Sequence, residues 1–143
     1  MIVELKHFGD LRDYIIQKTN VEEIVSFCNL NNIDEFIDIQ ENYCKNHDAI
    51  ILEFKDKNEI EGYIIGIVVQ DRELNDKIGI IVNLEYDNIN VLKQLVKKFK
   101  AIIKSQSCNY LKIQVPEYQK DILEILAENG YNSYRVELEK KLD

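Results

Sequence analysis

The chain has 143 residues, of which 45% are hydrophobic and one is proline, so we expect one ordered globular domain over residues 1–143. Its net charge of −8 disfavours binding to nucleic acid or to an anionic membrane surface, because both would repel it. Three cysteines without CxxC spacing and two distant histidines favour reduced thiols and give no support for a metal site.

The first part of the chain predicts one strand followed by three helices. Residues 2–6 alternate apolar and polar side chains, as a half-buried strand does. Helices are then expected over residues 10–18, over residues 19–30 and from Asp34 to about residue 45. Thr19 and Glu22 have the spacing of a capping box for the second helix, and Asp34 is the expected cap of the third.

The middle of the chain predicts three consecutive strands. Residues 49–54, 62–70 and 77–83 are rich in β-branched side chains and are separated by short charged segments. This spacing is typical of an antiparallel meander.

A long amphipathic helix comes next, with apolar residues on one side and lysines on the other. The apolar residues are Val91, Leu92, Leu95, Val96, Phe99, Ile102 and Ile103. A strand over residues 109–115, a helix over residues 117–129 that Gly130 ends, and a last strand over residues 131–142 complete the prediction. The fold class is therefore α/β (α+β), with a mixed sheet of about six strands flanked by helices.

This order of elements, closing with Gly130 and Tyr131 after the last helix, resembles the GNAT superfamily of acyl-CoA N-acyltransferases. In the loop after its fourth strand, that family has the consensus V-x-P-E-Y-R-G-x-G-x-G. The corresponding segment here reads V-N-L-E-Y-D-N-I-N-V-L, so that Val82, Glu85 and Tyr86 match. Asp87 stands in place of the family's arginine or glutamine, and Asn90 and Leu92 stand in place of two glycines.

The resemblance implies a GNAT-like fold and transfer of an acetyl group from acetyl-CoA to an amine, carried by a small molecule or by a protein. It implies that the backbone of Ile80 and Val82 binds the pantetheine arm. The coenzyme loop would consist of Asp87, Asn88, Ile89, Asn90, Val91 and Leu92. A carboxylate beside a pyrophosphate is repulsive, so we expect Asp87 to weaken coenzyme binding.

The catalytic groups of the family are only partly represented. Leu126 stands where many members have a tyrosine that protonates the leaving thiolate, and residues 77–82 contain no Asp or Glu, while Glu85 falls in the expected loop. Tyr118 and Glu53 are the remaining candidates for an acid and a base.

Several features have a second interpretation. The segment from Asp87 to Leu92 also fits a helix N-cap formed by Asn88 or Asn90, and the lysines of the long helix also fit a solvated surface. The protein would then be an inactive GNAT-fold binding module, or an α/β domain outside that family. We further expect a cytoplasmic protein, since no apolar run approaches the roughly 20 residues that cross a bilayer, and a last strand that can pair in a homodimer.

Overall fold

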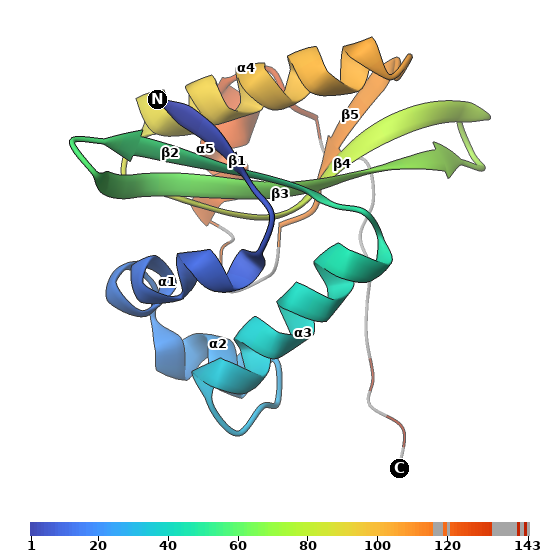
Figure 1. Cartoon of the computed structure of the whole chain (residues 1–143). Coiled ribbons are helices and arrows are strands. Elements are labelled where there is room, and N and C mark those ends of the chain that lie inside the picture. Colours follow the sequence, from blue (N-terminus) through green and yellow to red (C-terminus); the bar gives the residue numbers. More distant parts are fainter. Residues whose placement is uncertain (116–118, 120, 133–139, 141, 143) are drawn as a thin grey trace.

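The computed structural model describes residues 1–115, 119, 121–132, 140 and 142. Within these residues, five strands form one sheet in the order β1-β2-β3-β4-β5 (Figure 1). They are β1 (Ile2–Leu5), β2 (Ile50–Asp56), β3 (Glu59–Asp71), β4 (Asp76–Tyr86) and β5 (Tyr110–Ile113). The first four are antiparallel neighbours, which confirms the predicted meander, and β5 runs parallel to β4. The sixth strand expected from the sequence falls mostly outside the described residues.

Helices cover both faces of the sheet. A 3-10 turn (Phe8–Leu11), α1 (Arg12–Lys18), α2 (Val21–Phe27) and α3 (Ile33–Asn46) lie on one face, whereas α4 (Ile89–Ser105) and α5 (Asp121–Glu128) lie on the other (Figure 1). Because α4 connects β4 to β5, it provides the crossover that a parallel pair of strands requires.

Asparagine side chains cap α2, α3 and α4. Asn20, Asn32 and Asn88 each accept a hydrogen bond from a backbone N–H in the first helical turn, at 2.9 to 3.1 Å. The caps predicted at Thr19 and Asp34 are therefore wrong, although the helices themselves are present. Asn, Asp, Ser and Thr all form such caps, so residue type alone does not decide between neighbours.

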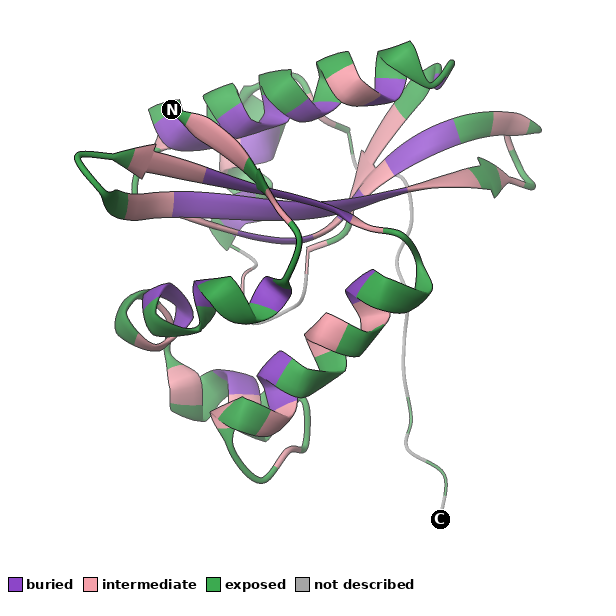
Figure 2. Ribbon diagram, viewed as in Figure 1, coloured by how far each residue is buried: buried purple, intermediate pink, exposed green. Residues whose placement is uncertain are grey.

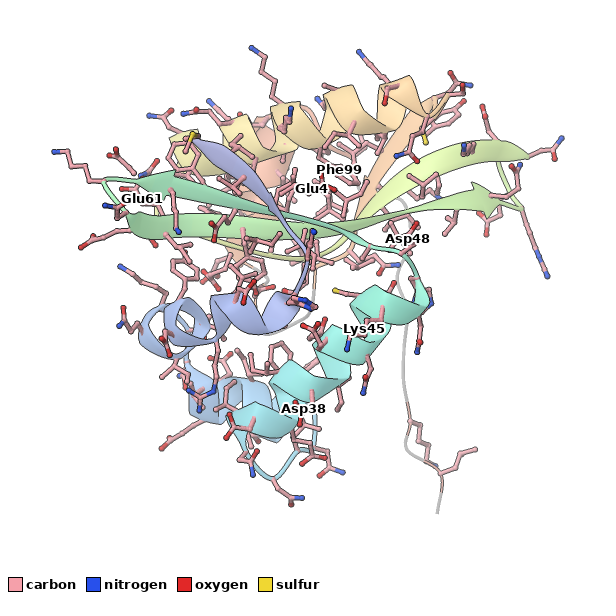
Figure 3. The ribbon with its side chains drawn as sticks, in the orientation of Figure 1. Glu4, Asp38, Lys45, Asp48, Glu61 and Phe99 are labelled. Carbon is pink, nitrogen blue, oxygen red and sulfur yellow. The ribbon has the colours of Figure 1, made fainter. Side chains whose placement is uncertain are left out.

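The sheet divides the core into two hydrophobic clusters, and the burial pattern matches the inward faces of the helices (Figure 2). On the α4 side, three strand glycines replace side chains where the helix approaches closely. A β-carbon at Gly62, Gly66 or Gly79 would lie within 2.7 Å of a side chain of α4. The ring of Phe99, at the centre of this contact, lies fully buried between α4 and the sheet (Figure 3).

Neither a membrane-spanning helix nor a metal-binding cluster is present among the described residues. None of the helices there has the length and apolar character to cross a membrane. No group of three His, Cys, Asp or Glu residues gathers there in a way that would hold a metal ion.

Candidate functional site

Strands β4 and β5 separate partway along β4. Their parallel pairing runs from Ile78 opposite Tyr110 to Ile81 opposite Ile113, and the Gln114 N–H donates to the Ile81 carbonyl at 2.9 Å. Strand β4 continues to Tyr86, and in the described part of the chain this last portion has no pairing with β5. The pairing of the two strands therefore ends next to Val82, one of the two residues whose backbone was expected to bind the pantetheine arm.

A β-bulge lies at the point of separation. Ile65 pairs with Asn83 and Gly66 pairs with Ile81, which leaves Val82 as the extra residue of β4. A bulge bends its strand and increases the local twist. The bulge therefore accounts for the departure of β4 from β5 beyond Ile81.

The side-chain amide of Gln119 lies at the unpaired edge of β4. Its Nε2 donates to the Leu84 carbonyl at 2.9 Å and to Oε2 of Glu85 at 3.3 Å. The Leu84 carbonyl therefore points toward the gap, and so does the Leu84 N–H, because both groups of a strand residue face the same edge. The gap thus presents main-chain hydrogen-bonding groups.

Glu85 is a functional candidate that the sequence pattern placed in the wrong element. The predicted strand ended at residue 83 and left Glu85 in a loop, but β4 extends to Tyr86 and Glu85 lies on it, opposite Tyr63. Burial raises the pKa of Glu85, whereas hydrogen bonds from the Tyr86 N–H and Gln119 lower it and the charge of Asp87 raises it further. The alternation of Leu84, Glu85 and Tyr86 was the signal for a longer strand.

Asp87 lies just after β4, and its carboxylate is bound by α1. Its Oδ1 accepts a hydrogen bond from the Tyr14 hydroxyl at 2.9 Å, and Lys18 Nζ lies 3.5 Å from Oδ2. Burial, together with the bond to Asp87, raises the pKa of Tyr14 well above its ordinary value. Tyr14 therefore stays protonated as the donor, and Lys18 offsets the charge that was expected to repel a phosphate.

The rest of the predicted coenzyme loop is the first turn of α4. The Asn88 side chain accepts from the Val91 N–H at 3.1 Å, so the interpretation of this segment as a helix cap is confirmed. Val91 and Leu92 are buried in the core, whereas Ile89 is half-buried and Asn90 is exposed. The Leu92 side chain fills the space between helix and sheet, so it does not block the approach to the backbone at the start of the helix.

Of the other predicted site residues, Glu53 and Ile80 lie away from the unpaired part of β4. Glu53 is 3% exposed on β2, beside Lys55 Nζ at 3.6 Å, and β3 separates it from β4. Ile80 lies opposite Lys112 in the paired part of β4, while Val82 is at the bulge. Tyr118 lies outside the described residues.

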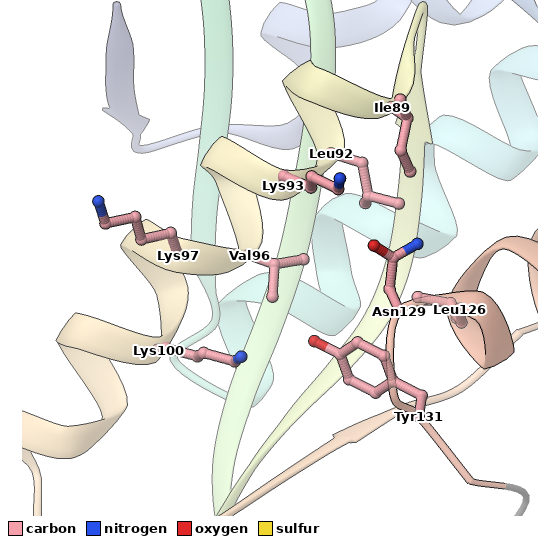
Figure 4. Close-up of a pocket in the computed structure, with 9 residues that line it drawn as sticks. All are labelled: Ile89, Leu92, Lys93, Val96, Lys97, Lys100, Leu126, Asn129 and Tyr131. Atoms are coloured by element: carbon pink, nitrogen blue, oxygen red, sulfur yellow. The ribbon is translucent and has the colours of Figure 1, made fainter.

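A cavity of about 270 Å³ lies between α4 and the end of α5 (Figure 4). Its lining residues are Ile89, Leu92, Lys93, Val96, Lys97, Lys100, Leu126, Asn129 and Tyr131. Three of them are lysines of α4, and Lys100 Nζ lies 5.9 Å from the centre of the Tyr131 ring. The cavity combines an apolar lining with positive charge, as a ligand with both apolar and anionic parts requires. Ile89 lines the cavity and is the first residue of α4, shortly after the end of β4. The cavity therefore lies beside the gap.

The order of the elements, with β4 and β5 separating beside the start of a long helix, is that of the GNAT-like fold expected from the sequence. No protein-family model and no curated protein matches the sequence, but solved structures match the fold.

One similar structure is a putative acetyl transferase from Pyrococcus furiosus, with a TM-score of 0.72, 14% identity and 99% of each chain covered. An aminoglycoside acetyltransferase from an uncultured soil metagenomic sample has a TM-score of 0.69 and 14% identity, over 100% of this chain and 96% of that chain. A transcriptional regulator from Bacillus halodurans has a TM-score of 0.72 and 12% identity, with 99% of each chain covered. At this level of identity the likeness shows the fold alone, so activity must be argued from the site.

Proposed function

We propose that the protein is an N-acyltransferase that transfers an acetyl group from acetyl-CoA to an amine. The observation that carries this proposal is the unpaired edge of β4 beyond Ile81, with the main-chain groups of Leu84 facing the gap and Glu85 beside them. Amide groups of a pantetheine arm form hydrogen bonds to such an edge, as an added strand does.

The residues around the gap fit the coenzyme. Lys93, Lys97 and Lys100 line the cavity beside it and would bind phosphate groups, while Leu92 and Val96 offer apolar contact. The charge of Asp87 is offset by Lys18. When bound, acetyl-CoA supplies an acyl group activated as a thioester.

Two residues of β4 would carry the chemistry. The Leu84 N–H would donate to the acyl oxygen as negative charge develops there, which is the usual role of a preorganised backbone donor. Glu85 would accept the proton that the amine loses as its nitrogen forms the C–N bond and the C–S bond breaks. A proton from Glu85 or from solvent then completes the free thiol. A pKa raised by burial suits this role, because a general base works best when its pKa approaches the working pH.

A second candidate function is the inactive binding module. One observation favours it: the Gln119 amide already occupies the Leu84 carbonyl, so a ligand at that group must compete with a side chain of the protein itself. Leu126 also lines the cavity without a hydroxyl group that could protonate a thiolate.

Calorimetric titration with acetyl-CoA, together with thermal unfolding in its presence, separates the two candidates. Ligand at about 100 times Kd would stabilise the native state by roughly 2.7 kcal/mol. The absence of heat and of any thermal shift at millimolar acetyl-CoA would favour the binding module.

The catalytic role of Glu85 is tested by Glu85→Gln. Release of thiol from acetyl-CoA in the presence of primary amines should fall by about 10² to 10⁴, while acetyl-CoA affinity is kept. Glu59→Gln, at the exposed start of β3, is the matched control. Full turnover in Glu85→Gln would exclude Glu85 as the base.

A further inference from the structure

The Gln119 amide connects the unpaired edge of β4 to Glu85. Its Nε2 donates both to the Leu84 carbonyl and to the Glu85 carboxylate. A carbonyl oxygen can only accept, so the nitrogen of the amide must face Leu84 and the oxygen must face the other way. The orientation of the amide is thus fixed by its partners.

One consequence concerns the charge of Glu85. Burial raises the pKa of this carboxyl, and the hydrogen bond from Gln119 acts in the opposite direction because it favours the ionised form. A base must be ionised before it can accept a proton. Gln119 therefore helps to keep Glu85 in its working form and also fixes the direction in which the carboxylate points.

The other consequence concerns the oxygen of the same amide. Gln119 Oε1 is buried, and no hydrogen-bond donor in the described part of the chain reaches it. Buried polar atoms nearly always have a partner, so an acceptor without one beside a ligand gap is a candidate contact for the ligand. A ligand can reach Oε1 only if the surrounding side chains move apart. The hydrogen bond that then forms between the ligand and Oε1 favours that open arrangement of the side chains.

The chemistry of this corner favours an amine over the coenzyme as that partner. Oε1 and the Glu85 carboxylate are both acceptors, and Lys18 is already engaged by Asp87. A neutral primary amine has two N–H donors and one lone pair. It can donate one N–H to Glu85 and the other to Gln119, with its lone pair left for the acyl carbon.

We propose that Gln119 is a positioning residue that orients Glu85 through Nε2 and selects primary amines through Oε1. This inference rests on the proposed acyl transfer. A secondary amine has a single N–H and cannot satisfy both acceptors. The protein should therefore prefer a primary amine to its N-methyl derivative by about tenfold, the effect of one hydrogen bond.

The test uses Gln119→Met, which keeps the length of the side chain without its amide, and Gln114→Met as a control at an exposed glutamine. Thiol release from acetyl-CoA is measured with butylamine and with N-methylbutylamine, and the Glu85 carboxyl is titrated by ¹³C NMR. In Gln119→Met the preference for butylamine should fall to about twofold or less, and the midpoint of Glu85 should move to higher pH. The Kd of acetyl-CoA should not rise by more than about twofold, because the lost amide only competes for the Leu84 carbonyl, and the control should match the parent protein.

The outcomes separate this inference from the proposed function. An unchanged preference for butylamine, or an unchanged Glu85 midpoint, would overturn the role of Gln119. If Gln119→Met binds acetyl-CoA tenfold more weakly but still prefers butylamine, Oε1 contacts the coenzyme. That result would also overturn the proposed role of Gln119. A parent protein that does not bind acetyl-CoA would refute the acyl transfer itself and with it the amine selection, while the Glu85 titration would still decide the positioning role. Gln119→Asn, a shorter amide, should give intermediate values if Gln119→Met folds poorly.

Discussion

The contact between Gly66 and Phe99 fixes how closely α4 approaches the sheet, and Gly66→Ala tests it. A β-carbon at Gly66 would lie 2.1 Å from the nearest carbon of the Phe99 ring and 2.3 Å from the next. The ring is 0% exposed and has no free volume into which to move. Overpacking of this kind costs about 1–3 kcal/mol, offset by about 0.4–1 kcal/mol from the reduced entropy of the unfolded chain. We expect a net loss of roughly 1–2 kcal/mol and a fall of roughly 4 °C in Tm.

Urea unfolding of Gly66→Ala, Phe99→Leu and the double variant measures this contact directly. The smaller side chain at position 99 should recover about 1 kcal/mol of the cost of the alanine, so the two changes should not be additive. Gly9→Ala is the control, because its β-carbon would meet only Glu41 Oε2, at 3.9 Å. A loss at Gly66 no larger than at Gly9, or strict additivity of the two core changes, would refute the close packing of α4.

Three further predictions concern the surroundings of the gap. The pKa of Tyr14 is raised, so the stability that Tyr14 contributes through its hydrogen bond to Asp87 is present below about pH 10 and is lost as the pH rises further. In urea unfolding, Tyr14→Phe should lower the free energy of unfolding by about 1–2 kcal/mol at pH 8, and this difference from the parent protein should shrink by pH 11. Constant destabilisation across that range would contradict the assignment. Asn88→Ala should lower the free energy of unfolding by about 0.5–2 kcal/mol through loss of the α4 cap, and no change would argue against that cap. Lys97→Gln should weaken coenzyme A binding by about threefold to tenfold in low-salt calorimetry and by less at 0.5 M salt, whereas Lys104→Gln, outside the cavity, should not; equal effects would exclude the cavity as the phosphate site.

The sequence predicted most of the architecture because the relevant signals are local. The period of the long helix, the β-branched runs of the meander and the glycine at position 130 each depend on a few consecutive residues. A cap at Asn88 or Asn90 was likewise predicted from residue type alone, and Asn88 forms it. All five lysines of the helix are exposed, but only Lys93, Lys97 and Lys100 line the cavity, whereas Lys98 and Lys104 do not, a division that depends on where α5 packs.

The candidate site was harder to predict because it depends on contacts between distant segments. Gln119 reaches Leu84 and Glu85 from 34 or 35 positions away, and no local pattern marks it. Glu85 was missed for a different reason. The family consensus has a loop at this position, and that expectation took precedence over the alternation of side chains, which favoured a longer strand.

Asp87 shows why a departure from a family motif needs a structural explanation before it is counted as a loss of function. In the sequence it replaces a basic or amide residue with a carboxylate, which by itself repels a phosphate. In the structure that carboxylate is turned toward α1, where the Tyr14 hydroxyl and the Lys18 ammonium bind it. The first turn of α4 keeps its capped geometry, and three lysines lie further along the same helix. Coenzyme binding therefore depends on whether the lysines of α4 bind the phosphate groups in place of the basic residue in the family's loop. The calorimetric titration of Lys97→Gln with coenzyme A tests this, whereas the sequence of the motif alone cannot decide it.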